Sequence, residues 1–132
     1  MTYVDANIFV YASLYDDARA ARCRGVLAAI AEGRLPACTS VLSWDEVSWI
    51  VERVAGRAAA VRQGERLLRF PGLRFVDCTP RLLAEAQRVR GATGLRPRDA
   101  LHAASARAAG ALEFVTEDSD FDAVGDLRTR RP

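Results

Sequence analysis

The sequence predicts a three-layer α/β/α domain in which helices cover both faces of a central, mainly parallel sheet of about five strands. Short apolar runs alternate with longer segments whose apolar residues recur every three or four positions, and these spacings are typical of buried strands and amphipathic helices. Strands that alternate with helices favour parallel pairing. The length of 132 residues is enough for one domain with a buried core but not for two, so we expect residues 1–132 to form a single domain.

The N-terminal third is expected to contain one strand and two helices. Residues 2–4 form a short buried strand, and residues 6–14 are apolar enough for a helix that packs on the sheet. Residues 17–32 have helical periodicity, and Gly33 followed by Pro36 is a usual signature of a helix C-terminus. The core residues expected from this second helix are Ala18, Ala21, Val26, Leu27 and Ile30.

The middle of the chain is expected to add two strands and two helices. A strand at residues 36–40 precedes a helix at residues 43–54, and Gly56 separates that helix from another at residues 58–70. The first of these helices carries an apolar stripe made of Val47, Ile50, Val51 and Val54. A Pro-Gly turn then leads to residues 73–77, which alternate as a strand does.

The C-terminal part is expected to begin with two helices that both start at a proline. The first runs from Pro80 to about residue 90, residues 91–96 form a loop, and Pro97 begins a helix that ends at Gly110. Proline is tolerated at the first helical position because the missing N–H has no partner there. The remaining expected elements are a strand at residues 112–116, a short helix at residues 118–124 and an edge strand at residues 126–129.

The composition indicates a globular protein and says little about its ligands. Half of the residues are hydrophobic, 27% are charged, and the formal net charge is only +2, which is too small to indicate a nucleic-acid binder by itself. All 19 basic residues are arginine, the better bidentate partner for phosphate. A GC-rich genome explains the same bias, and we prefer that explanation because alanine is also abundant.

The three cysteines exclude the usual disulfide and zinc patterns. Cys23, Cys38 and Cys78 are widely spaced and form no C-x-x-C motif, so we expect reduced thiols in a cytosol. The chain enters its first strand without a signal peptide, and no apolar run is long enough to span a bilayer. We therefore expect a cytoplasmic protein with no membrane contact.

Four acidic residues occupy places where an α/β chain has little structural use for them. Asp5 ends the first apolar run, Glu46 lies in an apolar helical stretch, Asp99 opens a helix, and Asp118 follows the last clear strand. Because sites in such sheets form beyond the carboxyl ends of strands, the fold can gather these carboxylates into a pocket for Mg²⁺ or Mn²⁺. Such a pocket predicts a metal-dependent phosphodiesterase, most plausibly a ribonuclease.

Each acid also has a structural alternative, but together the four need a cation. Asp99 can stabilise a helix start through the macrodipole. Glu46 has apolar helical neighbours and could pair with an arginine, although Arg53 lies too far round the helix to be ideal. Asp45, beside it, is expected in solvent. Two carboxylates about 5 Å apart repel by roughly 3 kcal/mol at an effective dielectric constant near 20, so four of them do not stay ionised together without a cation.

Several other residues could support this site. Asn7 could orient a ligand carboxylate or cap the following helix. His102, the only histidine, lies one turn after Asp99. It could reach a phosphate or act as an acid, but a lone histidine on an Ala-rich helix is more often structural, and we expect that role. Trp44 and Trp49 are expected in the core or an interface rather than as platforms for stacked bases.

At these acids the chain resembles the PIN-domain ribonucleases, and within them the VapC-type toxins of toxin–antitoxin pairs. The segments V-D-A-N-I-F, S-V-L-S-W-D-E-V, R-P-R-D-A-L-H-A-A-S-A and F-V-T-E-D-S-D-F resemble the four acidic motifs of that family in order. They place the four acids at Asp5, Glu46, Asp99 and Asp118. The similarity extends from Val4 to Phe121, and the third segment is its most specific part.

The resemblance implies a five-stranded parallel sheet between helices and the activity of a Mg²⁺- or Mn²⁺-dependent endoribonuclease that cleaves RNA. It also implies that the chain forms a homodimer and binds an antitoxin whose C-terminal segment covers the active-site groove. Asp5, Asp99 and Asp118 would hold the metal, and Glu46 would be a further ligand or a base that positions water. Arg98 would meet charge on the phosphate. The supporting residues implied around the site are Asn7, Thr116, Asp120 and Asp122.

The fourth motif contains three aspartates, and its assignment depends on the end of the strand. Asp118 lies within two residues of the predicted strand, whereas Asp120 lies beyond it and Asp122 is a further half turn away. We therefore expect Asp118 to be the ligand and Asp122 to face solvent or support the site from outside.

Two other functions compete with a nuclease. Phosphoryl transfer through an aspartyl phosphate also uses an aspartate after a strand, but it needs a lysine, which the chain lacks, and usually a D-x-D motif where this chain has D-x-N at Asp5. A non-catalytic PIN-like module that binds RNA or a partner is the second alternative, and the presence of all four acids argues against it.

Overall fold

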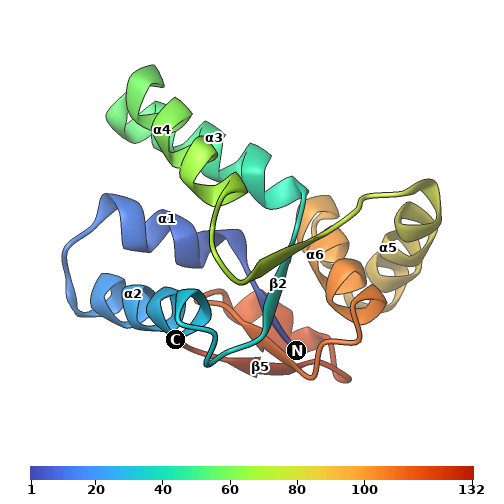
Figure 1. The fold of residues 1–132 in the computed structure, drawn as a ribbon. Coiled ribbons are helices and arrows are strands. Elements are labelled where there is room, and N and C mark those ends of the chain that lie inside the picture. The colour runs from blue at the N-terminus through green and yellow to red at the C-terminus, as the bar shows by residue number, and fades with distance from the viewer.

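The computed structural model describes residues 1–132 and contains one five-stranded sheet in the order β3-β2-β1-β4-β5 (Figure 1). All neighbouring strands are parallel. The strands are β1 (Thr2–Val4), β2 (Ala37–Ser40), β3 (Leu73–Val76), β4 (Glu113–Val115) and β5 (Arg128–Arg130). The helices are α1 (Ala6–Leu14), α2 (Ala18–Ala31), α3 (Leu42–Ala55), α4 (Arg57–Leu68), α5 (Pro80–Thr93), α6 (Pro97–Ala108) and the short 3₁₀ helix η1 (Ser119–Ala123).

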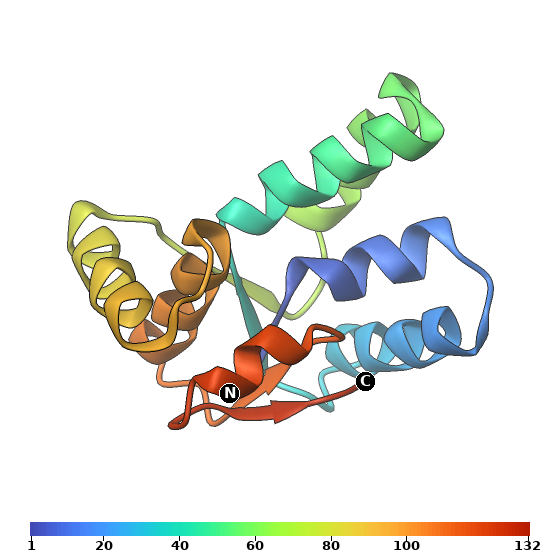
Figure 2. The same ribbon diagram turned by 180° about the vertical axis from the view of Figure 1, so that it is seen from behind.

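Two hydrophobic cores lie on opposite faces of the sheet. Side chains of neighbouring strand residues point to opposite faces, so Tyr3 and Phe114 enter the core under α5, α6 and η1, whereas Val4 and Val115 enter the core under α1, α2, α3 and α4. Figures 1 and 2 show α5 and α6 on one side of the sheet and α1 and α2 on the other, with α3 and α4 forming a hairpin that extends beyond it. The predicted three-layer arrangement is confirmed.

The core on the α6 side is built around a run of aromatic rings. The rings of Tyr3 and Phe114 stack with centroids 4.9 Å apart, and Phe114 contacts Phe121 of η1 at 4.4 Å. All three side chains are almost fully buried. They fix η1 beneath the carboxyl end of β4, which is the end from which the predicted acids emerge.

Three sequence predictions about the helices were wrong. The helix predicted to end near residue 90 continues to Thr93, so the first half of the predicted loop at residues 91–96 is helical. Gly94, with a φ of 73° that suits glycine, is the C-cap of this helix. Ala18 and Ala21 are exposed, and Ala20 and Cys23 are buried in their place. Val54 is 58% exposed because the end of α3 packs on α4 rather than on the sheet.

Gly72, the residue before β3, lies so close to the backbone of Ile30 in α2 that only glycine fits there. Gly72 has a φ of 75°, and a Cβ built there would lie 2.6 Å from the carbonyl oxygen of Ile30. A larger residue would therefore strain the backbone and displace α2 as well.

All three cysteines are free, with Cys23 and Cys38 buried and Cys78 exposed. No helix has both the length and the apolar character that crossing a membrane requires.

Candidate active site

Strand register brings two of the predicted acids to one edge of the sheet. β1 and β4 pair in parallel with Val4 opposite Val115, so the next residues, Asp5 and Thr116, leave the sheet side by side. Asp118 follows two residues later. Because parallel strands end at the same edge, the topology places Asp5 and Asp118 at one edge of the sheet, as the sequence predicted.

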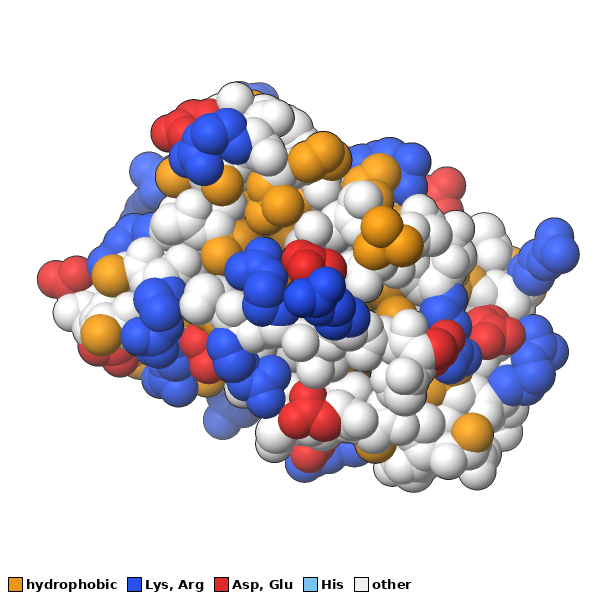
Figure 3. Space-filling model, turned by 90° about the horizontal axis from the view of Figure 1, so that it is seen from below, with side chains coloured by type: hydrophobic (Ala, Val, Ile, Leu, Met, Phe, Trp, Pro, Cys, Tyr) orange, Lys and Arg blue, Asp and Glu red, His pale blue; other side chains and the backbone are white.

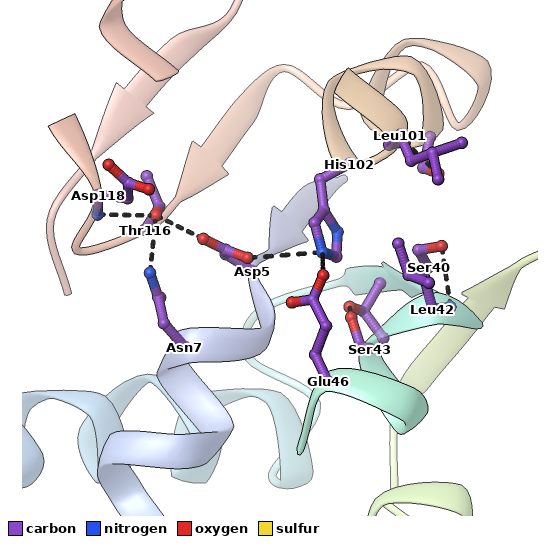
Figure 4. A network of polar contacts seen from close by, with 12 residues as sticks. Asp5, Asn7, Ser40, Leu42, Ser43, Glu46, Leu101, His102, Thr116 and Asp118 are labelled. Atoms are coloured by element: carbon purple, nitrogen blue, oxygen red, sulfur yellow. Dashed lines mark hydrogen bonds and ion pairs between the residues drawn. The ribbon is translucent and has the colours of Figure 1, made fainter. Parts of the chain in front are cut away.

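The acids gather into two adjoining groups around this edge. Asp5, Glu46 and His102 offer ligand atoms that all lie within 4.8 Å of one another, and so do Asp99, Asp118 and Asp120. Glu46 comes from α3 and Asp99 from the first turn of α6. Figure 4 shows Asp5 between the Glu46–His102 pair on one side and Thr116 with Asp118 on the other.

Thr116 holds the carboxylate of Asp5 in place. Its hydroxyl donates to Oδ2 of Asp5 at 2.7 Å and accepts from the side-chain amide of Asn7 at 3.1 Å and from the backbone N–H of Asp118 at 3.0 Å. Asn7 also accepts from the backbone N–H of Glu117 at 3.4 Å. Asn7 therefore orients Asp5 through Thr116, and the alternative that Asn7 caps the helix is wrong, because it lies inside the first turn of α1.

Asp5 precedes α1 but does not act as a helix cap. It is the residue at the N-cap position, yet its side chain makes no capping hydrogen bond, although aspartate is among the best residues for that role. Its carboxylate is instead 5% exposed and faces the other acids. Burial, with the charge of Glu46, raises the pKa of Asp5 against the opposing effects of His102 and Thr116.

His102 is a central part of the site. It is 1% exposed, its Nε2 lies 2.9 Å from Oε1 of Glu46 and 3.9 Å from Oδ1 of Asp5, and its Nδ1 lies 2.6 Å from the hydroxyl of Tyr3. That hydroxyl also accepts from the backbone N–H of Ser40 at 3.0 Å. The ring thus connects α3, α6, β1 and β2, so it does more than fill space on α6.

The partner of Glu46 is not the arginine that the sequence suggested. The arginine considered for it, Arg53, lies over the ring of Trp49 instead, and His102 takes its place. A carboxylate only accepts hydrogen bonds, so Nε2 of His102 carries the proton in this contact. Burial lowers the pKa of His102, but the hydrogen bond to Glu46 and the nearby charges outweigh it and leave that pKa above its usual value. The signal in the sequence was the single histidine one turn after Asp99.

The electrostatics of the second group favour a cation. Burial and the charges of Asp118 and Asp5 raise the pKa of Asp99 to about 6, so the carboxylates of this region repel one another. Asp99, Asp118 and Asp120 offer only carboxylate oxygens, which suit hard ions such as Mg²⁺ and Mn²⁺ better than zinc. The residues present therefore fit the predicted ion.

The geometry corrects the expected place of Asp120 and agrees with that of Asp122. In a tight turn after β4, Oδ1 of Asp118 accepts from the backbone N–H of Asp120 at 2.8 Å. Because of this turn Asp120 lies in the cluster with Asp99 and Asp118, whereas the sequence placed it beyond the site. Asp122 accepts from the hydroxyl of Thr129 at 2.8 Å and lies 3.7 Å from Arg131. It therefore supports the last strand from outside the site.

A cavity of about 500 Å³ opens above the acids. Its lining residues are Glu46, Trp49, Ile50, Arg96, Pro97, Arg98, Asp99 and Asp118. Arg98 is more than half exposed and lies 3.8 Å from Asp45, a similarly exposed carboxylate. Such an exposed pair contributes little stability, so Arg98 is free to turn toward an anion in the cavity, while Asp45 is in solvent as expected.

The raised pKa of Asp99 predicts how pH affects the metal-free protein. The pKa of an unfolded aspartate is about 3.9, so the folded chain binds this proton more tightly, and the resulting stability is full below about pH 4 and lost as pH rises through about 6. We expect the melting temperature of Asp99→Asn, minus that of the wild type, to increase from pH 4 to pH 7 in EDTA. A difference that stays constant over this range would show that the Asp99 carboxyl is not perturbed.

Comparison with known proteins identifies the fold and the family. A sequence model of the PIN domain matches residues 2–127. The toxin VapC20 of Mycobacterium tuberculosis, described as cleaving the sarcin-ricin loop, has 22% identity and a TM-score of 0.80, with 97% of this chain and 99% of that chain covered. No protein with a curated function matches the sequence.

Two assembled complexes also contain similar chains. VapBC2 of Rickettsia felis, bound to a DNA fragment from its promoter, has 20% identity and a TM-score of 0.73, covering 99% of this chain and 98% of that chain. DNA-bound VapBC of Salmonella typhimurium has 14% identity and a TM-score of 0.74, covering 98% and 96%. These similarities establish the fold, and the match over residues 2–127 shows that the chain belongs to the PIN-domain family.

Proposed function

We propose that this chain is a metal-dependent endoribonuclease that acts as the toxin of a toxin–antitoxin pair. The observation that carries the proposal is the gathering of Asp5, Glu46, Asp99 and Asp118 at the carboxyl edge of a parallel sheet, beside one open cavity. The positions are those of the acidic motifs that the chain shares with PIN-domain ribonucleases. RNA phosphodiesters are the substrate class.

The residues divide the work of hydrolysis between them. Asp99, Asp118, Asp120 and Asp5 would hold Mg²⁺ or Mn²⁺, which when bound supplies an acidified water and charge neutralisation at the phosphate. Glu46, held by His102, is placed to accept a proton from the attacking water. Arg98 is placed to stabilise the charge that develops on the phosphate oxygens.

Charge on the face shown in Figure 3 forms no single basic patch that would direct RNA to the site. Figure 3 shows arginine side chains spread over the face seen from below, with acidic side chains among them, instead of one continuous basic patch. The net charge is only +2, so long-range steering of a polyanion is weak. Recognition therefore depends on groups close to the acidic cavity.

The test of this function is RNA cleavage by the purified chain with Mn²⁺, with Mg²⁺ and with EDTA. We expect cleavage with either ion and none with EDTA. Because water rather than the ribose 2′-hydroxyl attacks, the products should contain no 2′,3′-cyclic phosphate, which separates this activity from that of a metal-independent contaminant. RNA binding without cleavage under all three conditions would support the non-catalytic alternative instead.

The proposed partners are a second copy of the chain and an antitoxin. Support comes from the exposed apolar side chains on the α3–α4 hairpin, Val54, Val61 and Leu68, each at least 50% exposed, since such surface commonly marks an interface. The similar chains in VapBC complexes favour the same assignment.

We predict a homodimer by light scattering, and co-purification with a small protein encoded beside this chain when both are expressed together. Expression of the chain alone should arrest growth. A monomer at high concentration that leaves cells unharmed without any partner would contradict the assignment as a toxin.

A further inference from the structure

We infer that Trp49 stacks on an unpaired base of the RNA, next to the phosphate held at the acids. The inference rests on the proposed ribonuclease function and adds a recognition residue to it. Of the two places that the sequence analysis expected for Trp49, the core is excluded, because the residue is 49% exposed; we propose a base-stacking role in place of the other, a protein interface.

The position of Trp49 ties it to the acids rather than to the rest of the surface. It lies one helical turn after Glu46 on α3, so the two side chains lie on the same side of the helix. Both line the cavity that also contains Asp99, Asp118 and Arg98. A nucleotide whose phosphate reaches the acids thus brings its own base, or the next one, to the indole.

Arg53 lies over the indole of Trp49, and Trp49 is still 49% exposed. The guanidinium carbon of Arg53 lies 4.5 Å from the centroid of the Trp49 ring, so a cation–π contact holds the ring from that face. No other aromatic side chain contacts it. An exposed aromatic ring beside a site for phosphate is the arrangement with which single-stranded nucleic-acid binding proteins stack on bases.

Trp44 provides a contrast on the same helix. It is 46% exposed, but its indole nitrogen lies 3.1 Å from the place of a Cβ at Gly64, and it lines a different cavity between α3 and α4. Packing against α4 accounts for Trp44. Five residues on, Trp49 has no such contact and faces the acidic cavity instead.

These are the only two tryptophans of the chain, so each can be made the only residue excited at wavelengths that tyrosine does not absorb. Trp44→Phe leaves Trp49, and Trp49→Phe leaves Trp44. Both variants are made in an Asp118→Asn background and studied in EDTA, so that the RNA is not cleaved. Each is titrated with an eight-nucleotide single-stranded RNA or with an abasic strand of the same length and charge. We expect RNA to quench the fluorescence of Trp49 but not that of Trp44, and the abasic strand to quench neither.

Affinity for the same two strands gives the second measurement. Trp49→Ala should weaken RNA binding roughly 5- to 100-fold, the range of aromatic–base stacking, while Trp49→Phe keeps most of the affinity and Trp44→Ala leaves it unchanged. Binding of the abasic strand should not depend on residue 49. Wild-type RNA affinity in Trp49→Ala, or equal quenching by both strands, would overturn the inference.

Cleavage by the otherwise wild-type chain separates this inference from the proposed function. Normal Mn²⁺-dependent cleavage with no effect of Trp49→Ala would reject the stacking role alone. If Trp49→Ala keeps its RNA affinity but fails to co-purify with the small protein encoded beside this chain, the indole belongs to the interface with that protein and the inference is rejected. Absence of cleavage in every variant would reject the ribonuclease function instead.

Discussion

Asp5→Asn is expected to reduce metal-dependent RNA cleavage by at least about 100-fold, because even residues that only support a metal ligand are typically worth 10- to 100-fold. The same variant should leave the metal-free protein as stable as the wild type or more so. Initial rates of Mn²⁺-dependent cleavage and melting temperatures in EDTA measure the two effects.

The stability prediction follows from the surroundings of Asp5. Its carboxylate is buried and its pKa is raised, first by burial and then by the charge of Glu46, so ionised Asp5 is unfavourable at neutral pH without a cation. Asparagine keeps an oxygen that can accept from the Thr116 hydroxyl, now at 2.7 Å, and removes the charge. The lost attraction to His102, 3.9 Å away, offsets part of the gain.

Metal binding gives the same experiment a second readout. A ligand that binds only the folded state stabilises it by about 2.7 kcal/mol when present at 100 times its dissociation constant, so millimolar Mn²⁺ should raise the melting temperature of the wild type and raise that of Asp5→Asn much less. Asp16→Asn, at an aspartate whose side chain is fully exposed, should behave as the wild type in both measurements. A clear loss of metal-free stability in Asp5→Asn would make Asp5 a structural residue.

Residues at strand ends could be placed from the sequence because topology alone decides their position. Asp5 and Asp118 were predicted at one edge of a parallel sheet, and the register of β1 with β4 places them there. Asp99 was placed by a Pro at the start of its helix, and it lies in the first turn of α6. These predictions needed only the order of elements and the rule that parallel strands end together.

Contacts between helices could not be placed in the same way. Glu46 and His102 are 56 positions apart, and their contact depends on how α3 and α6 pack across the edge of the sheet, which no spacing in the sequence reports. Asp120 lies at the site because of a turn in which its backbone N–H donates to Oδ1 of Asp118. Trp49 was expected in the core or an interface, but it is 49% exposed on a helix that packs mainly against α4.

The last prediction orders the three aspartates of the fourth motif. Asp118→Asn should reduce Mn²⁺-dependent cleavage by about 100-fold and Asp120→Asn by about 10-fold, within the range for groups in and around metal sites, while Asp122→Asn should change it by no more than about 2-fold, as surface changes away from such features usually do. One RNA substrate and three purified variants are sufficient for the measurement.

The order follows from what each carboxylate contacts. Asp118 is half-buried beside β4, and its charge raises the pKa of Asp99 more than any other charge does. The repulsion between Asp118 and Asp99 is therefore the repulsion that a bound cation would relieve most. Asp120 is exposed, so water competes with a metal ion for its carboxylate. Asp122 binds Thr129 and lies near Arg131, away from the acids, which makes it a matched control on the same 3₁₀ helix.

Replacement by asparagine separates the charge of Asp118 from its local structural role. Oδ1 of Asp118 accepts from the backbone N–H of Asp120 at the start of η1, and asparagine is as good a cap as aspartate, so the turn should survive while the charge is lost. A large loss of activity with an unchanged melting temperature in EDTA would therefore report the charge alone. If Asp120→Asn proves more damaging than Asp118→Asn, the metal lies further along the turn, and the carboxylate nearest the strand serves mainly to shape η1.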